Sequence, residues 1–170
     1  MIRAVRRVNG VIEGVLISAA ALLFAVFIGA IIWQVAARSL LSWSVRWTDE
    51  VALMCFVWSV FLGAAVAFRR GVHYVVDIVS AERVLASNLL RLFGTLACLP
   101  IIWIMITHGQ IYADMGWRRS SMALEVPMFW IFVAIPVSGV AMAIFAVEVL
   151  WEDLRRLVTG TPPPQPQDEP

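Results

Sequence analysis

Two residues that could do chemistry, His73 and Asp77, lie four residues apart in a valine-rich stretch. At that spacing they would share one face of a short helix. They could form a local hydrogen bond or ion pair, contact another subunit, or contribute to a metal site. A metal site needs three or four ligands, and the only other histidine, His108, lies beyond the next apolar run. Metal binding is therefore disfavoured, whereas the other two interpretations stay open.

Two arginines, Arg69 and Arg70, stand just before this pair and directly after an uncharged run. Arginines in this position interact favourably with the negative end of a helix and with lipid head groups. Gly71 is suited to end the helix, because glycine readily adopts the left-handed conformation. The pattern indicates the end of a membrane helix, with or without a contact to a partner.

The two cysteines, Cys55 and Cys98, each lie alone inside an apolar run, so neither indicates a disulfide or a metal ligand. A haem bundle needs axial ligands at suitable depths, and a quinone–disulfide enzyme needs paired cysteines. The sequence supplies neither set. We therefore expect no cofactor and no membrane redox enzyme.

The composition is that of an integral membrane protein. Of the 170 residues, 61% are hydrophobic and 15% are charged, with a mean hydropathy of +0.85. A soluble domain has about a quarter of its residues charged. The net charge of +1 argues against a nucleic-acid-binding protein, which needs a basic face.

Four stretches of 18 to 24 residues lack Asp, Glu, Lys and Arg: Gly14–Ala37, Val51–Phe68, Leu92–Ala113 and Val126–Val147. About 20 residues suffice for a helix to cross the hydrocarbon core. Continuous apolar runs do not match the alternating pattern of barrel strands. The sequence predicts an all-α protein with four transmembrane helices and short interfacial segments.

We expect one membrane domain over residues 1–157 and a disordered, proline-rich tail over 158–170. The first apolar run exceeds the length of a signal-peptide core, so an uncleaved helix is expected. The spans are expected at about 11–37, 51–68, 89–113 and 126–150.

The arginines predict the orientation. Nine arginines lie in the two tails and the link between spans two and three, and four lie in the other two links. Because cytoplasmic segments carry the excess of basic residues, both termini are expected in the cytoplasm.

Polar residues at the ends of the spans predict local features. Thr48 could cap span two, with Asp49 and Glu50 in its first turn, where the helix dipole favours carboxylates. Pro136 and Gly139 predict a kink in span four.

Mid-membrane charges, which usually mark a transport or proton site, are missing from all four runs. Glu13, Gln34 and His108 lie only near the ends of their spans. Small residues allow close helix packing, either within the chain or against a partner. They are Gly63, Ala64, Ala65 and Ala67 in span two and Gly139, Ala141 and Ala143 in span four.

Two stretches resemble the small, four-helix (Q-type) membrane subunit of tripartite ATP-independent periplasmic (TRAP) transporters. The first, Trp47–Val79, contains Asp49–Glu50, Phe61-Leu62-Gly63-Ala64-Ala65, Arg69-Arg70-Gly71, His73 and Asp77. The second, Met122–Gly139, has the Ala-Leu, Pro-aromatic and Ile-Pro pattern at the start of the last helix. Val76 replaces a basic residue found in many relatives, and Asp49 stands where glutamate is usual.

This resemblance implies a component of a secondary-active transporter in the bacterial inner membrane, and not an enzyme. The small subunit would be a scaffold for a large permease subunit, and a periplasmic substrate-binding protein would deliver an organic acid anion for sodium-coupled uptake. The sequence does not identify the substrate.

Contacts to another subunit or to membrane lipids are expected at Trp47, Asp49, Glu50, Arg69, Arg70, His73 and Asp77. An alternative from another class is a stand-alone four-helix, proton-coupled exporter. That protein would need a carboxylate at mid-membrane, for which Glu13 is poorly placed.

Overall fold

The structure, a computed structural model, describes residues 2–40, 46–71 and 84–161. Four of its helices are long and apolar enough to cross a membrane. The all-α, four-span prediction is therefore confirmed. The helices are α1 (Ile2–Leu40), α2 (Trp47–Arg70), α3 (Val84–Met115), the 3-10 turn η2 (Gly116–Arg118), α4 (Phe129–Phe132) and α5 (Ala134–Thr159).

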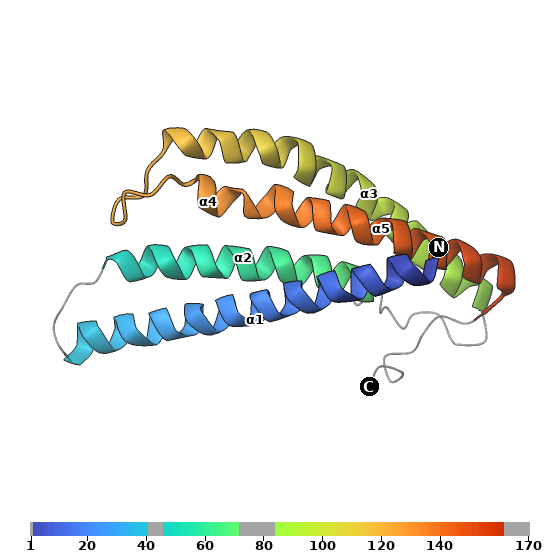
Figure 1. Cartoon of the computed structure of the whole chain (residues 1–170), viewed down its shortest axis with the longest axis horizontal. Helices are drawn as coiled ribbons and strands as arrows, with labels where there is room; N and C mark the ends of the chain where they lie inside the picture. Colours follow the sequence, from blue (N-terminus) through green and yellow to red (C-terminus); the bar gives the residue numbers. More distant parts are fainter. Residues whose placement is uncertain (1, 41–45, 72–83, 162–170) are drawn as a thin grey trace.

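The long helices form two hairpins (Figure 1). Helix α1 packs along α2, α3 packs along α5, and α2 joins the hairpins by packing against α5. The hairpins lie close together at the end where α1 begins and α5 ends, and they diverge toward the opposite end (Figure 1). The beginning of α1 and the end of α5 thus lie at one end of the molecule, which we call the terminal end.

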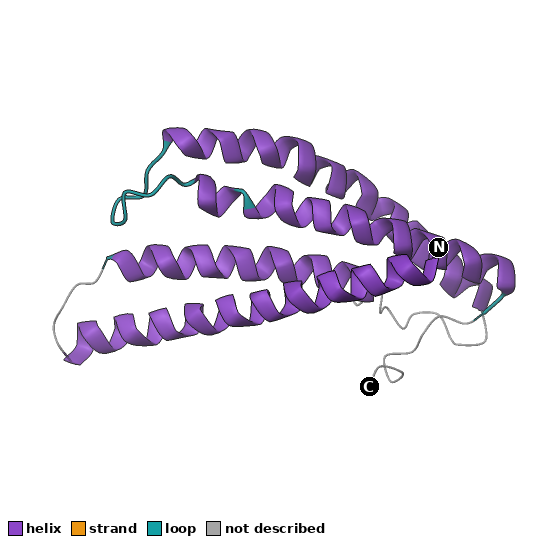
Figure 2. Ribbon diagram, in the orientation of Figure 1, coloured by secondary structure: helices purple, strands orange, loops and turns teal. Residues whose placement is uncertain are grey.

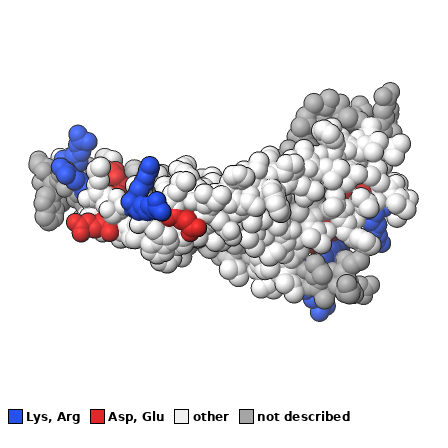
Figure 3. Space-filling view, turned by 90° about the horizontal axis from the view of Figure 1, so that it is seen from above, with Lys and Arg blue, Asp and Glu red and all other residues white. Residues whose placement is uncertain are grey.

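The buried core lies where α2, α3 and α5 meet. Ala65 and Phe68 of α2 pack with Ile102 of α3 and Phe145 of α5, and all four are at least 95% buried. Much of the remaining apolar surface is exposed, as expected for a protein whose solvent is lipid. Charged side chains gather toward the two ends of the face drawn in Figure 3, with an uncharged stretch between them.

The fourth span is interrupted, as its proline predicted. Helix α4 ends at Phe132, Val133 forms a turn, and α5 begins at Ala134 (Figure 2). Pro136 has no N–H to offer to Phe132, and its ring crowds that carbonyl, which explains a break one turn before the proline. The Trp58 indole N–H donates to the carbonyl of Trp130 at 2.8 Å, so α2 contacts α4 beside the break.

Glycines allow α3 and the fourth span to approach closely. A Cβ on Gly139 would lie 3.0 Å from the Cβ of Met105, and one on Gly116 would lie 2.4 Å from the backbone nitrogen of Phe129. Of the small residues noted in the sequence, Ala65 and Gly139 therefore serve contacts within the chain. Gly63, by contrast, borders open space, and Ala64 is exposed.

The ends of α2 match one prediction and correct another. Gly71 ends the helix in the left-handed conformation, with φ of 66°, which confirms the expected cap. The proposed Thr48 cap is wrong: α2 begins at Trp47 with Arg46 in the cap position, and Thr48 is buried within the first turn. Asp49 and Glu50 do lie in that turn, as predicted.

Candidate functional site

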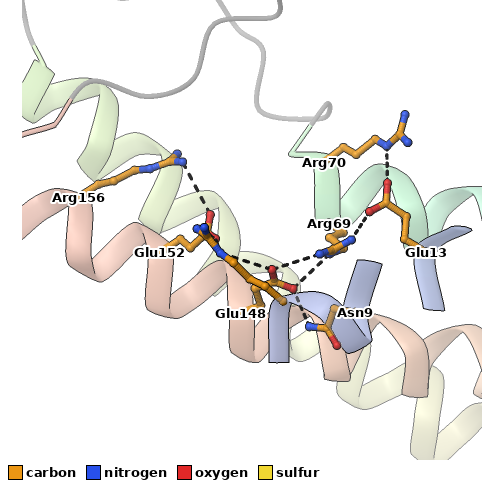
Figure 4. A network of polar contacts seen from close by, with 8 residues as sticks. Asn9, Glu13, Arg69, Arg70, Glu148, Glu152 and Arg156 are labelled. Atoms are coloured by element: carbon orange, nitrogen blue, oxygen red, sulfur yellow. Dashed lines mark hydrogen bonds and ion pairs between the residues drawn. The ribbon is translucent and has the colours of Figure 1, made fainter. Parts of the chain in front are cut away.

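A network of polar side chains joins α1, α2 and α5 at the terminal end (Figure 4). We call it the Arg69 network. Its central members are Arg69 and Arg70 of α2, Glu13 of α1 and Glu148 of α5. Asn9 and Arg6 of α1, with Glu152 and Arg156 of α5, complete it.

Arg69 is the centre of this network. Its Nε and Nη2 each donate to Glu148 at 3.2 Å, and its Nη1 donates to Glu13. The Arg69 guanidinium also lies 5.5 Å from the centre of the Phe145 ring, within cation–π range. The side chains of Arg69 and Glu148 are only 14% and 9% exposed. One cation therefore holds carboxylates from two different helices in a mostly buried position.

The other members extend the network to both sides. Arg70 donates Nε to Glu13 at 2.6 Å, and Asn9, which is buried, donates to Glu148 at 2.6 Å. Arg6 donates Nε to Glu152 at 2.9 Å. The network thus ties the first turns of α1 and the second half of α5 to the last turn of α2.

A second polar cluster, the Asp153 clasp, holds α3 against α5 at the same end. The Asp153 carboxylate accepts from Arg91 Nε at 2.7 Å and from the Thr95 hydroxyl at 2.6 Å. Asp153 and Thr95 are both at least 99% buried. Arg91, which directly precedes the uncharged run of the third span, is thereby neutralised and not left free.

At the opposite end, Glu50 of α2 holds the loop before α4. Its carboxylate accepts from the Ser121 hydroxyl and from the backbone N–H groups of Ala123 and Leu124, both at 2.8 Å. The loop over residues 119–128 is folded on itself, with Ser121 N–H bonded to the Val126 carbonyl at 2.9 Å. Glu50 therefore connects the two hairpins at the end where they diverge.

We expect Glu50→Ala to loosen the 119–128 loop, because three donors lose one shared acceptor. Hydrogen exchange at the amides of Ala123 and Leu124 should accelerate by about tenfold or more. Asp49→Ala is the matched control, since Asp49 accepts a described bond only from the Gln34 amide. Unchanged exchange at these amides in Glu50→Ala would show that the loop folds without the carboxylate.

The structure brings together only part of the predicted contact set. Arg69 and Arg70 belong to one network, while Trp47, Asp49 and Glu50 lie at the other end of α2, with the Trp47 side chain exposed. His73 and Asp77 lie outside the described residues.

The expectations from the sequence do not include the partners of Arg69 and Arg70. Glu13 and Glu148 directly border the uncharged runs of spans one and four, at the same end as Arg69. Opposite charges bordering neighbouring spans at one end are a signal that could have predicted their pairing.

No group of three or more His, Cys, Asp or Glu residues able to hold a metal ion occurs among residues 2–40, 46–71 and 84–161. The polar groups of the Arg69 network and the Asp153 clasp are mostly bonded to one another. Such an arrangement fixes helices in place and is typical of a structural joint.

Comparisons with known proteins agree with this picture. A sequence model of the family "Tripartite ATP-independent periplasmic transporters, DctQ component" matches residues 27–156. The chain is 27% identical over 141 residues to the sialic acid TRAP transporter small permease protein SiaQ of Vibrio cholerae, covering 81% of this chain and 80% of that protein. It is also 27% identical over 106 residues to the C4-dicarboxylate TRAP transporter small permease protein DctQ of Rhodobacter capsulatus, covering 61% of this chain and 47% of that protein.

The family match covers most of the chain, including all four spans in whole or in part. Proteins of this kind are multi-pass membrane components that work with other TRAP components, and they are not enzymes. The chain therefore belongs to the DctQ component family of TRAP transporters, as a small permease subunit.

Proposed function

We propose that this subunit is a membrane scaffold for a large permease subunit, in a transporter that takes up an organic acid anion. A periplasmic binding protein delivers the substrate, and a sodium gradient drives its uptake by symport. The names of two relatives, which refer to sialic acid and C4-dicarboxylates, support an acid as the substrate. The subunit itself binds no substrate in its core.

The observation that carries the scaffold role is the unpartnered face of α1. Only 6% of the residues in the most apolar 18-residue window of α1 are buried within the chain, compared with 39% of the residues in the corresponding window of α2. At about 1.5 Å per residue the 39 residues of α1 span roughly 58 Å, well beyond the hydrocarbon core. This long helix has one side on α2 and the other side available to a partner.

Small residues on that free side support a helix as the partner. A Cβ on Gly10, Gly14 or Gly29 would have nothing within 4 Å. Ser18, Ala21 and Ala25 are also exposed, and the spacing places all six within roughly a third of the helix circumference. Small residues let a neighbouring helix approach closely in lipid.

The proposed topology places both termini in the cytoplasm of a bacterium, with the subunit in its inner membrane. The beginning of α1 and the end of α5 lie together at the terminal end (Figure 1), which supports placing both termini on the same side of the membrane. The arginine distribution supports the cytoplasmic side.

We further propose two regions of contact. Trp47, Asp49 and Glu50 set the periplasmic end of α2, near the docked binding protein. Arg70, His73 and Asp77 serve the cytoplasmic end, in contacts with the large permease or with lipid. Arg69 supports this contact region by holding α2 to Glu13 of α1 and Glu148 of α5.

Co-purification tests the scaffold role. With this chain tagged and solubilised in mild detergent, we expect the large permease to co-purify at near-equal amounts. Gly14→Leu should lower that yield by about tenfold, because the added side chain separates the packed helices. Ala97→Leu makes a similar change on the exposed face of α3 and should leave the yield unchanged. A chain that never retains the large permease would contradict the proposal.

A further inference from the structure

We propose that the pocket beside the Arg69 network binds the phosphate group of a phospholipid with a net negative charge, with Arg70 and Arg6 as donors. The pocket has a volume of about 480 Å³ and opens to the surface between α1, α2 and α5. Charged side chains line most of it: Arg6, Glu13, Arg69, Arg70, Glu148 and Glu152.

The arginines of this pocket have more donors than the neighbouring carboxylates use. Arg70 gives only Nε to Glu13, and Arg6 gives Nε and Nη2 to Glu152. A guanidinium carries five N–H donors. Both Nη atoms of Arg70 and Nη1 of Arg6 therefore lack an acceptor among the described residues. An anion with several oxygens would supply acceptors for these donors.

Accessibility separates the arginines into two roles. The side chains of Arg70 and Arg6 are 40% and 54% exposed, whereas that of Arg69 is 14% exposed and fully engaged with Glu13 and Glu148. In Figure 4 the Arg70 guanidinium lies on the far side of Glu13 from Arg69. Arg69 thus holds the helices together, and the other two remain available to a ligand.

The position of the pocket indicates that the phosphate belongs to a lipid. Arg70 is the last residue of α2 before the Gly71 cap, so it stands where the span ends. One turn deeper on the same helix faces, Ile17 follows Glu13 by four residues and Ile144 precedes Glu148 by four. Ile17 and Ile144 are 40% and 42% exposed, and they offer an apolar surface to acyl chains beneath the head group.

Phosphate oxygens could also come from a free phosphate ion, and the experiment distinguishes these two sources. It uses the small subunit alone, so its outcome is independent of any partner permease and of the proposed scaffold role.

The test measures lipid retained by the purified full-length chain, using native mass spectrometry after mixing with phosphatidylglycerol or phosphatidylcholine. We expect at least about fivefold preference for phosphatidylglycerol, and about tenfold lower retention in Arg70→Gln, which removes charge-assisted bonds. Arg6→Gln is the second variant. Arg155→Gln is the matched control, because Arg155 is an exposed arginine of the same end with no described ion pair.

Thermal unfolding followed by circular dichroism checks that each variant is folded. Preferential retention that is lost in Arg70→Gln or Arg6→Gln, but kept in Arg155→Gln, supports the site. Displacement of the lipid by millimolar inorganic phosphate would support a phosphate-binding site in the pocket, with free phosphate as its ligand instead of lipid. Equal retention of both lipids, or equal losses in all three variants, would overturn the proposal.

Discussion

Replacing Glu148 with alanine is expected to destabilise the protein by about 3 kcal/mol, because it leaves a mostly buried arginine without its main partner. Arg69 would keep only Glu13, and the buried Asn9 amide would lose its acceptor. The two hairpins would then be joined at the terminal end by the Arg6–Glu152 pair and by apolar contacts of α2 with α5. Unfolding of the purified chain in mixed micelles, followed by circular dichroism, measures this loss.

A double variant makes the same prediction more specific. Arg69→Met with Glu148→Leu replaces the buried ion pair by apolar side chains of similar size, and such replacements are often neutral or stabilising. We expect the double variant to recover most of the stability lost in Glu148→Ala. Asp114→Ala is the surface control, since Asp114 is exposed and has no described ion pair. A Glu148→Ala variant as stable as Asp114→Ala would show that the network does not contribute to the stability of the fold.

The second large effect is expected in the Asp153 clasp. Asp153→Ala leaves Arg91, whose side chain is 14% exposed, without the carboxylate that neutralises it. The fully buried Thr95 hydroxyl loses the same partner. We expect a loss of about 3–5 kcal/mol, typical of breaking a buried pair from one side.

Hydrogen exchange locates this effect. In Asp153→Ala, exchange should accelerate in the first turns of α3, near Asn88 to Thr95, and in the last turns of α5. Thr95→Val removes a hydroxyl that donates to Asp153 and to the Arg91 carbonyl, but it removes no charge, so it should cost only about 1 kcal/mol. Uniform acceleration along all four long helices would instead indicate global unfolding and contradict a local clasp.

Much of the architecture could be predicted from residue types alone. The uncharged runs predicted the four spans, because lipid excludes charged side chains over a fixed thickness. Gly71 and Pro136 predicted a helix end and a kink, since each acts through its own backbone. Such features depend on the local chain and need no knowledge of neighbouring helices.

Contacts between helices were the part that local reasoning missed. Glu13 is expected near the end of span one from the sequence, but its pairing with Arg69 depends on α1 packing against α2. Glu50 was explained by the helix dipole, although its carboxylate also holds a loop more than 70 residues later in the chain. The residue type of Thr48 predicts a helix cap, whereas its buried position reflects tertiary packing.

The small residues show the same division. The sequence could not distinguish contacts within the subunit from contacts with a partner. The structure places Gly139 against Met105 and Ile106, inside the chain. It leaves Gly10, Gly14 and Gly29 on the free side of α1. These three glycines were not among the small residues expected at helix contacts.

Reconstitution into liposomes tests the central claim most directly. With the large permease, the binding protein and an inward sodium gradient, we expect uptake of the organic acid only when this subunit is present. Liposomes that hold this subunit alone should transport neither the acid nor protons. Uptake by the large permease at the full rate without this chain, or solute transport by this chain alone, would contradict the scaffold account.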